Sequence, residues 1–585
     1  MDDSTKLVYG PSSTKFILQG DLKHSDTLFH TMDSTLYGFS SFETKKNKDK
    51  FYYDLGNNGT AMVPMYYSVP ETIGRTTGFN AYDPFVKTAD EFKYYDSKSP
   101  YIYLGVVFGG SGRNIVDFEF SRNVTPDWNI GFDIYKISSE KQIGSASLKE
   151  SQVANTTIDL HTFYRTKNRK YHLMFHAYRF QHYVTETGGI RTDTDPEDYF
   201  QYQNSSINLA DAFSADLRSR WHLYHQYSLK PFFEVYNSVQ YTKSVNEYVD
   251  ESPASAQYYD EFLIRTDSTL DAAQFEEYRI EAGIKGRIAN RIYYTGYVKH
   301  RDLSFKYSFL NPYGVVKENY LGGDLRLLIT KKNELGGKAE LSDDGLFFFK
   351  GYFKNNFLKA SYTGSRYSPS FMADNYLGNH YEWHNSFNPT FANSIKGSVF
   401  YQLPFVRLEA LVDASTITDF VYFDYDQTPK QNNGTLISNR ISGKVDFNIN
   451  GKIHFENQVV YNNIAGDNPE TMRAPELNYF GRWYYADILF KNDMETQIGF
   501  DLRWQSEFYG KAYDPITQQF YIQNDLNMDN YAAVDFFFIV KSNDLTLFFK
   551  LNYINQKRDG GYFESPYYPG MTRTFDMGLR WMFFD

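Results

Sequence analysis

The sequence predicts an all-β protein, a large antiparallel transmembrane β-barrel of about 22 strands (range roughly 18–22), with short periplasmic turns and long extracellular loops. Three observations predict this fold: apolar and polar residues alternate over long stretches, tight turns alternate with long polar stretches, and the chain ends on an amphipathic strand. Because side chains on a strand point alternately to opposite faces, each stretch has one oily and one charged face. A barrel in a bilayer needs that pattern, with its apolar face toward lipid.

The clearest alternating stretch runs from Met494 to Gln505, where Ile498, Phe500 and Leu502 alternate with polar residues. Similar stretches of about 10–15 residues recur, whereas strands of soluble proteins average about five or six. A giant soluble sandwich is the alternative fold. It is disfavoured because the polar faces carry both signs of charge and could not fill a dry core unless every charge were paired.

Composition narrows the class of protein. The chain has 585 residues, with 52 Tyr and 51 Phe, and its mean hydropathy is -0.55. We find no run of 18 apolar residues, which excludes a helical membrane protein. Tyr suits a membrane interface, because one end of its ring is apolar and the other is polar. The net charge of -11 argues against nucleic-acid binding, and the absence of Cys excludes disulfides and thiolate metal sites.

Residues 1–100 differ from the rest of the chain. Alternation is patchy there, and the stretch contains Gly56–Gly59, Pro64, Pro70 and the basic run Lys45–Lys50. We interpret residues 1–100 as an N-terminal periplasmic or lumenal segment, with a few additional strands as the alternative. Residues 101–585 are then the transmembrane β-barrel.

Turn signals punctuate residues 101–585. Clusters of Asn, Asp, Gly and Pro mark tight hairpins. Longer polar stretches lie between many of them and predict extracellular loops. If turns and loops alternate, the short turns near Gly110 and Asp344 must face outward. The predicted long loops are 140–153, 187–205, 246–272, 306–319, 368–391, 418–434, 465–474, 509–525 and 557–570.

Charged residues that alternate with the apolar positions are the candidates for lining the pore. A barrel of this strand count is too wide for its own side chains to fill. Charges that face a pore set its ion preference, and the mixture of signs here predicts weak selectivity. The pore-lining candidates are Arg279, Lys285, Arg287, Arg407, Glu409, Asp413, Lys444, Asp446, Glu456, Asp501 and Arg503.

The last strand carries a pattern of a polar residue, a glycine and two spaced aromatics: Asp576, Gly578, Trp581 and Phe583. This pattern resembles the terminal signal of outer-membrane barrels, although here the chain runs two residues beyond the final aromatic. The resemblance implies recognition by the barrel-assembly machinery through strand pairing. The other expected partners are the lipid bilayer and, in one hypothesis below, further outer-membrane proteins or lipoproteins.

A family resemblance begins near residue 90. Tyr94–Tyr101 and Val107–Gly110, continued by Phe118–Asn123, Asn129–Asp133 and Lys141–Gly144, resemble the start of the putative porin family of Bacteroidota-type outer-membrane barrels. The motifs cover about residues 90–145, and the remainder matches in architecture. The resemblance implies a location in the outer membrane of a Gram-negative bacterium. It supplies no catalytic motif.

The sequence gives little support for a metal site, a phosphate-binding loop or a catalytic site. His172 and His176 lie about 13 Å apart on a strand, too far to share a metal, and are better explained as polar lumen lining. The acidic loop 193–198 lacks the spacing of a calcium loop. Gly109–Gly112 is a hairpin, since no Lys-Ser/Thr follows it. No nucleophile–base motif stands out, so we expect no enzyme, no metal and no cofactor.

Three functions remain open. The leading hypothesis is a porin for passive diffusion of small hydrophilic solutes or ions. The second is a non-enzymatic subunit of a larger outer-membrane complex for secretion or assembly. The third is TonB-linked uptake. The strand count suits it, but the N-terminal region is short for a full plug and we see no energy-coupling box.

Overall fold

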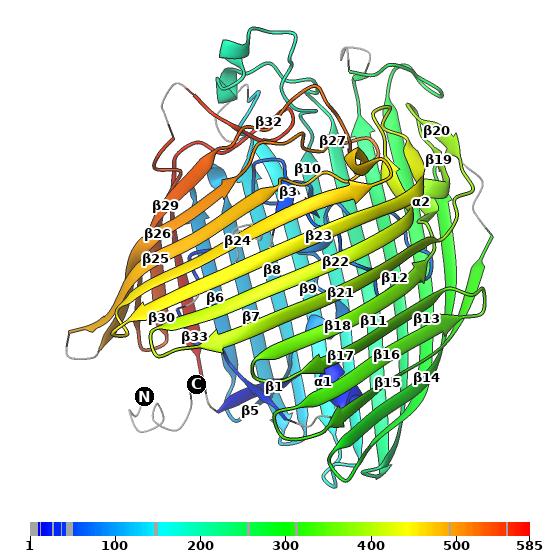
Figure 1. Ribbon diagram of the computed structural model, residues 1–585, viewed down its shortest axis with the longest axis vertical. Coiled ribbons are helices and arrows are strands. Elements are labelled where there is room, and N and C mark those ends of the chain that lie inside the picture. Colours follow the sequence, from blue (N-terminus) through cyan, green and yellow to red (C-terminus); the bar gives the residue numbers. More distant parts are fainter. Residues whose placement is uncertain are drawn as a thin grey trace.

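The computed structural model describes residues 10–584, except 12, 26–27, 37, 43–50, 146–149, 254–257, 310–313, 491–492 and 557–559. Its main element is a closed antiparallel barrel of 22 strands, which confirms the predicted fold (Figure 1). The first half of the wall is β6 (Tyr101–Gly109), β7 (Asn114–Thr125), β8 (Trp128–Glu140), β9 (Ser151–Arg165), β10 (Tyr171–Thr185), β11 (Phe213–Lys230), β12 (Phe233–Asp250), β13 (Thr269–Ile288), β14 (Ile292–Tyr307), β15 (Val316–Leu328) and β16 (Glu334–Ser342). The second half is β17 (Phe347–Lys354), β18 (Leu358–Tyr367), β21 (Thr390–Gln402), β22 (Val406–Phe423), β23 (Pro429–Ile449), β24 (Ile453–Gly466), β25 (Leu477–Leu489), β26 (Met494–Gln505), β29 (Ala532–Ser542), β30 (Leu545–Asn552) and β33 (Thr574–Phe583).

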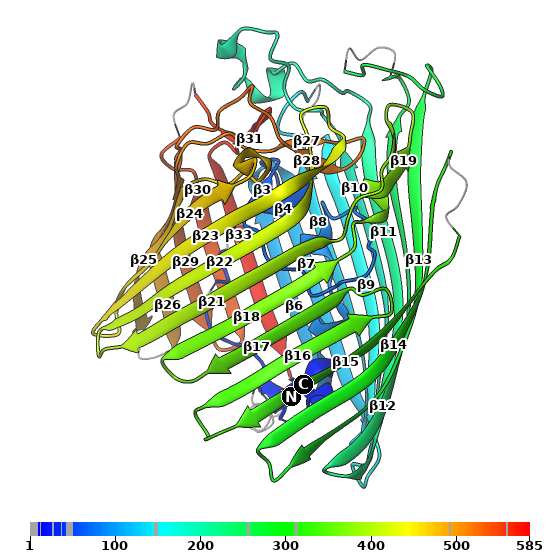
Figure 2. The same ribbon diagram turned by 45° about the vertical axis from the view of Figure 1, so that its right-hand side comes forward.

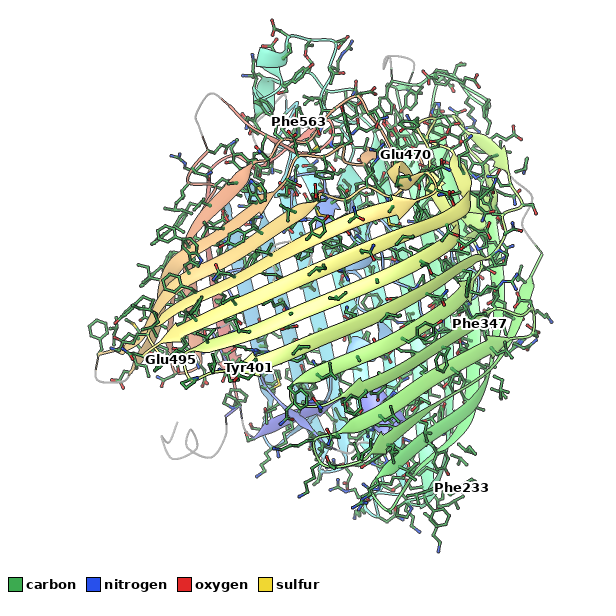
Figure 3. All side chains as sticks on the ribbon, in the orientation of Figure 1. Phe233, Phe347, Tyr401, Glu470, Glu495 and Phe563 are labelled. Carbon is green, nitrogen blue, oxygen red and sulfur yellow. The ribbon has the colours of Figure 1, made fainter. Side chains whose placement is uncertain are left out.

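The wall strands keep the predicted alternation. On β26, Ile498 and Phe500 are 39% and 41% exposed, whereas Asp501 is 3% exposed and faces inward. Tyr401, labelled in Figure 3, is 59% exposed on the outer face near the short-turn end. An outer band of apolar and aromatic side chains is what contact with hydrocarbon requires, because lipid cannot hydrogen-bond polar groups. No helix in the described part of the chain is long and apolar enough to cross a membrane.

The first and last wall strands close the barrel. β33 pairs antiparallel with β6, from Asp576 opposite Gly109 to Phe583 opposite Ile102. The carboxylate of Asp576 accepts a hydrogen bond from Arg113 at 2.6 Å, and both side chains are fully buried. Arg113 follows the short turn between β6 and β7, so this ion pair ties that turn to the last strand. Closure removes the free edges that an open sheet would expose to lipid.

Residues 14–97 are here called the lumenal segment, and the described residues among them pass through the interior of the barrel (Figures 1 and 2). Near the short-turn end they form the sheet β2–β1–β5, and the hairpin β3–β4 lies toward the long-loop end. The elements are β1 (Thr14–Ile17), α1 (Gln19–Lys23), β2 (His30–Thr31), β3 (Tyr52–Asp54), β4 (Met62–Pro64), η2 (Asp83–Phe85), η3 (Ala89–Glu91) and β5 (Tyr94–Ser97).

The lumenal segment packs against the inner wall rather than forming a core of its own. Ile17, Leu22 and Phe92 share a buried cluster with wall residues such as Phe180 and Tyr224. Gly59 adopts a positive φ of 87°, and a Cβ there would lie 2.6 Å from Val153 of β9. Only glycine permits so close an approach in that conformation.

The long loops fold over one end of the barrel, and short turns lie at the other (Figure 1). β26 pairs directly with β29, so the hairpin β27 (Ala512–Asp514) and β28 (Gln519–Tyr521) stands apart from the wall and reaches β22 at Phe423. The predicted loop 509–525 thus contains a hairpin, which contributes to the buried clusters at this end. The remaining elements are η4 (Gly110–Gly112), η5 (Pro196–Asp198), η6 (Tyr202–Asn204), α2 (Phe371–Asp374), β19 (Asn375–Leu377), β20 (Glu382–His384), η8 (Pro469–Thr471), β31 (Phe563–Ser565) and β32 (Tyr568–Pro569).

Candidate functional site: the partly filled lumen

The eleven predicted pore-lining residues all occupy strand positions that alternate with outward-facing apolar ones. Their surroundings differ. Lys285 is fully buried and donates hydrogen bonds to the Gln226 side chain at 2.6 Å and to the Leu22 carbonyl of the lumenal segment. Asp501 accepts from Lys550 at 3.0 Å, and Arg503 donates to Asp535 at 3.3 Å. These three side chains are held by protein partners. Arg279 is partly exposed but also pairs with Glu277 at 2.8 Å, and Arg287 is partly exposed.

A cavity of about 450 Å³ remains between the lumenal segment and the β18–β24 side of the wall. Phe51, Tyr52, Pro64 and Tyr66 of the lumenal segment form one side of it. Two predicted residues, Glu409 and Lys444, line the other side and form an ion pair at 3.8 Å. The unfilled part of the lumen is therefore polar and charged along the wall and aromatic along the lumenal segment.

A second cavity of about 310 Å³ shares Lys359 and Phe400 with the first. Its other lining residues include the predicted Arg407 and the β17–β18 turn residues Asn355 and Asn356. Short turns face the periplasm in barrels of this kind. The two cavities together follow the wall from the middle of the barrel to its periplasmic end.

The predicted Asp413, Asp446 and Glu456 lie on the same side of the wall. Asp413 accepts from Arg440 at 2.6 Å and lies 3.9 Å from Lys396. Asp446 is opposite Arg407 on β22 and opposite Glu456 on β24. The side-chain hydroxyl of Tyr484 donates to Glu456 at 3.3 Å. The sequence missed Lys359, Lys396 and Arg440, although each alternates with an apolar neighbour and the same rule would have found them.

An ion-pair cluster holds the lumenal segment on the opposite wall. The Lys87 ammonium donates hydrogen bonds to Asp133 of β8 and Asp159 of β9, each at 2.9 Å. Asp159 in turn contacts Nδ1 of His161 at 3.1 Å. Among the described residues, Asp133, Asp159 and His161 lie close enough together to share a cation. The Lys87 ammonium already occupies the position between the two carboxylates, so the group is an ion-pair cluster. No local sequence pattern predicts it, because β8, β9 and the lumenal segment meet only in the fold.

His176 faces the lumen but is covered by the lumenal segment. The Phe92 ring stacks on it with ring centroids 3.7 Å apart, and the Tyr94 hydroxyl lies 2.9 Å from its Nδ1. His172, four residues earlier, stacks on Phe163 rather than sharing a ligand with His176. In the acidic loop, Arg191 pairs with Asp193.

Glu186, one residue beyond β10, joins three parts of the extracellular cover. It is 2% exposed and accepts hydrogen bonds from Tyr82 of the lumenal segment at 3.3 Å and from Tyr513 of β27 at 3.4 Å. Burial raises the pKa of Glu186 to about 7, because a buried carboxylate loses its hydration. The junction between loop, hairpin and lumenal segment therefore favours the protonated acid.

We expect this junction to weaken as the pH rises. The folded-state pKa lies above the ordinary value of 4.5, so the stabilisation is fully present below about pH 4.5 and is lost as the pH rises through about 7. An Ala61→Cys substitution places a thiol in the buried cluster beside Tyr82 and Tyr513, in a chain that has no other Cys. Its maleimide labelling, normalised to an exposed Asn168→Cys, should accelerate between pH 5.5 and pH 8. Glu186→Gln should flatten that pH dependence, whereas Glu251→Gln in an exposed loop should leave it intact. An unchanged profile in Glu186→Gln would contradict the assignment.

The residues of the predicted assembly signal lie on both faces of β33. Asp576 is buried on the inner face, and a Cβ at Gly578 would lie 2.3 Å from the Phe548 ring, so glycine is needed there. Trp581 is 42% exposed on the outer face, with its ring 4.2 Å from that of Phe583. Recognition by the assembly machinery and association with other outer-membrane proteins or lipoproteins stay predictions.

Several solved structures share this fold, and their titles name transporters and receptors. The copper transporter OprC matches with a TM-score of 0.67 and 10% identity, covering 91% of this chain and 94% of the other. The FrpB iron transporter from Neisseria meningitidis matches with a TM-score of 0.61 and 11% identity, covering 83% and 82%. The siderophore receptor PiuA from Acinetobacter baumannii matches with a TM-score of 0.56 and 10% identity, covering 83% and 82%. Identities this low establish a shared fold alone.

A search of curated proteins found no match. A family model described as "putative porin" matches residues 18–585, nearly the whole chain, and therefore includes most of the lumenal segment as well as the barrel. The family match agrees with the resemblance noted near residues 90–145. Together with the 22-strand barrel, it places the protein in the bacterial outer membrane. The chain belongs to the putative porin family of outer-membrane β-barrels.

Proposed function

We propose that this protein is a gated channel through which small hydrophilic solutes cross the outer membrane along the β18–β24 side of its lumen. The observation that carries the proposal is a pair of adjacent cavities along that wall, the larger of which is also lined by the lumenal segment. Polar and charged side chains line the wall of these cavities, and a hydrated solute needs such a surface. The family match supports a pore-forming role in general.

The extracellular end of this route is covered, which is why we describe the channel as gated. Tyr67 of the lumenal segment lies 3.2 Å from the hydroxyl of Tyr367 and packs edge-on against Phe420. With Val69 it joins a buried apolar cluster that includes Ile417 and Leu436, at the extracellular ends of β22 and β23. Passage would require this contact to open. The gate then differs from the constriction of an open porin, because it is made by a separate segment of chain.

Single-channel recording of the purified protein in planar bilayers tests the proposal. We expect discrete openings with a small conductance for so wide a barrel, since the lumenal segment fills much of the interior. Tyr67→Ala should open the channel more often, because it removes the Tyr367 and Phe420 contacts without touching a wall strand. A protein that is folded and inserted but passes no current, alone or as Tyr67→Ala, would overturn the proposal.

Energised, TonB-linked uptake is the second candidate. The observation that favours it is that a segment of the chain occupies the interior of a 22-strand barrel, and the solved structures of similar fold carry titles of metal and siderophore transport. The lumenal segment would then have to move or rearrange during each cycle. In the channel proposal, only the gate contacts around Tyr67 open, and the rest of the lumenal segment stays docked against the barrel wall.

A covalent tether separates these two candidates. The Asn57 side chain donates to Gln152 of β9 at 2.6 Å, so an Asn57→Cys/Gln152→Cys pair can be joined by a short bis-maleimide. Tethering should leave conductance intact if the segment stays docked, and should abolish solute uptake by whole cells if the segment must leave. The control is a Lys452→Cys/Asp487→Cys tether, which joins the β23–β24 turn to β25 at an ion pair of 2.7 Å, away from the lumenal segment.

A further inference from the structure

Basic side chains gather on the wall of the two adjacent cavities. Lys396, Arg440 and Lys444 line the larger cavity, Arg407 lines the smaller one, and Lys359 lines both. One carboxylate, Glu409, is found among the lining residues of the two cavities. These five cations come from four neighbouring wall strands, β18, β21, β22 and β23. They extend from the middle of the barrel to the periplasmic turns.

Nearby carboxylates neutralise some of these cations and leave others. Asp413 pairs with Arg440 and Lys396, and Glu409 pairs with Lys444. Lys359 has no carboxylate within ion-pair distance in the described part of the chain, and its ammonium lies 4.8 Å above the Phe400 ring. Arg407 likewise has no such partner there. Asp446 is the residue opposite Arg407 in the strand register, but the two side chains do not form an ion pair. Both unpaired cations are exposed to the lumen.

The strand register adds further positive charge beside Lys359. Lys354 of β17 lies directly opposite Lys359 of β18, and Lys338 lies directly opposite Lys350 one strand pair away. Like charges that face each other across a strand pair destabilise it. Glu334 pairs with Lys354, and Glu71 of the lumenal segment pairs with Lys338 and Lys350. Lys359 gains no such relief from a carboxylate, so a mobile anion in the cavity would stabilise it.

We propose that this channel selects small anions, which it binds transiently along the Lys359–Arg407 side of the two cavities. The inference deepens the proposed function, on which it rests for the passage of solute, and replaces the weak selectivity that the mixed sequence pattern predicts. Cations held against low-dielectric walls concentrate counter-ions in a cleft by about tenfold or more. Several weak sites in series allow an anion to bind without being trapped. A solute with a carboxylate or phosphate group carries the charge that such a wall attracts.

A single introduced thiol measures the charge of the cavity directly, because the chain has no Cys. Ser398 lines the larger cavity opposite Lys359, so Ser398→Cys reports the local potential whether or not the protein conducts. We expect an anionic methanethiosulfonate reagent to react with it about tenfold faster, relative to a cationic one, than with Asn168→Cys in an exposed turn. Lys359→Gln/Arg407→Gln should remove most of that preference. Neither substitution strands a paired carboxylate among the described residues.

A matched control removes the same number of positive charges as Lys359→Gln/Arg407→Gln, but elsewhere on the barrel. Lys167→Gln/Lys170→Gln removes two exposed cations from the β9–β10 turn, at the same end of the barrel but away from the cavities. It should leave the Ser398→Cys preference unchanged, and 1 M salt should weaken the preference by screening. A ratio near one in the wild-type background, or an equal loss in the control, would overturn the proposal.

Reversal potentials in a KCl gradient give the functional readout. The wild type should be permeable chiefly to chloride, Lys359→Gln/Arg407→Gln should shift the reversal potential toward potassium, and the turn control should not. If the protein carries no current, the proposed function fails, while the thiol ratio still decides whether the cavity attracts anions. A cation-selective current would refute anion selection and leave the channel function standing.

Discussion

Deletion of residues 14–97 should convert the protein into a wide, continuously open pore with a conductance several-fold above that of the full chain. A barrel of 22 strands is too wide for its own side chains to fill, and the lumenal segment occupies much of the space they leave. The wall itself needs no contribution from this segment, since every wall strand pairs with two other wall strands. Planar-bilayer recording of the refolded deletion variant measures the effect, with heat-dependent mobility on gels as the test of folding.

Lys87→Met is a second variant that keeps the whole chain. It removes the ammonium that pairs with both Asp133 and Asp159, of which Asp159 is 2% exposed. Breaking a buried ion pair from one side costs about 3–5 kcal/mol, because the remaining charge is left unpaired. The segment should therefore undock more often and give bursts of the large conductance seen in the deletion variant. Thr88→Ala, beside it but outside this cluster, is the control. A folded deletion variant that conducts no better than the full chain would show that the loops, rather than the lumenal segment, close the pore.

Arg113→Ala should cause the largest loss of barrel stability from a single substitution, about 3–5 kcal/mol. Arg113 is fully buried and donates to the Asp576 carboxylate at 2.6 Å, to the Thr574 hydroxyl at 2.8 Å and to the Gly110 carbonyl at 3.0 Å. The substitution leaves the Asp576 charge without its cation at the seam where the last strand meets the first. The urea midpoint of unfolding, monitored by gel mobility and tryptophan fluorescence, measures the effect.

Replacing both partners should restore part of that loss. The Arg113→Met/Asp576→Leu variant leaves neither charge of this pair behind, and apolar replacements of buried ion pairs are often neutral or stabilising. Lys452→Ala removes one partner of an ion pair of similar length, 2.7 Å to Asp487, but in an exposed turn, so little change is expected there. Equal effects of Arg113→Ala and Lys452→Ala would contradict the role given to the seam.

The wall of this barrel could be predicted from the sequence because its signals are local. Alternation with period two fixes which face of a strand meets lipid, and Asn, Asp, Gly and Pro clusters fix where the strands turn. The strand count of 22, the outward faces of Ile498 and Phe500 and the short outer turns near Gly110 and Asp344 all follow from such patterns. A closed barrel then follows physically, because no strand edge can remain open in lipid.

The contents of the lumen were decided only in the tertiary structure, because the contacts that create them join distant parts of the chain. The Tyr53 hydroxyl donates to the carbonyl of Arg473, 420 residues away, and no local pattern encodes that pair. The predicted pore-lining residues also show that a local pattern does not encode contacts with distant parts of the chain. Alternation placed Lys285 and Arg407 alike on the inner face, but the lumenal segment covers Lys285 and leaves Arg407 beside an open cavity. Sequence alone therefore determined which side chains face inward, and packing of residues 14–97 against the wall determined which of them meet water.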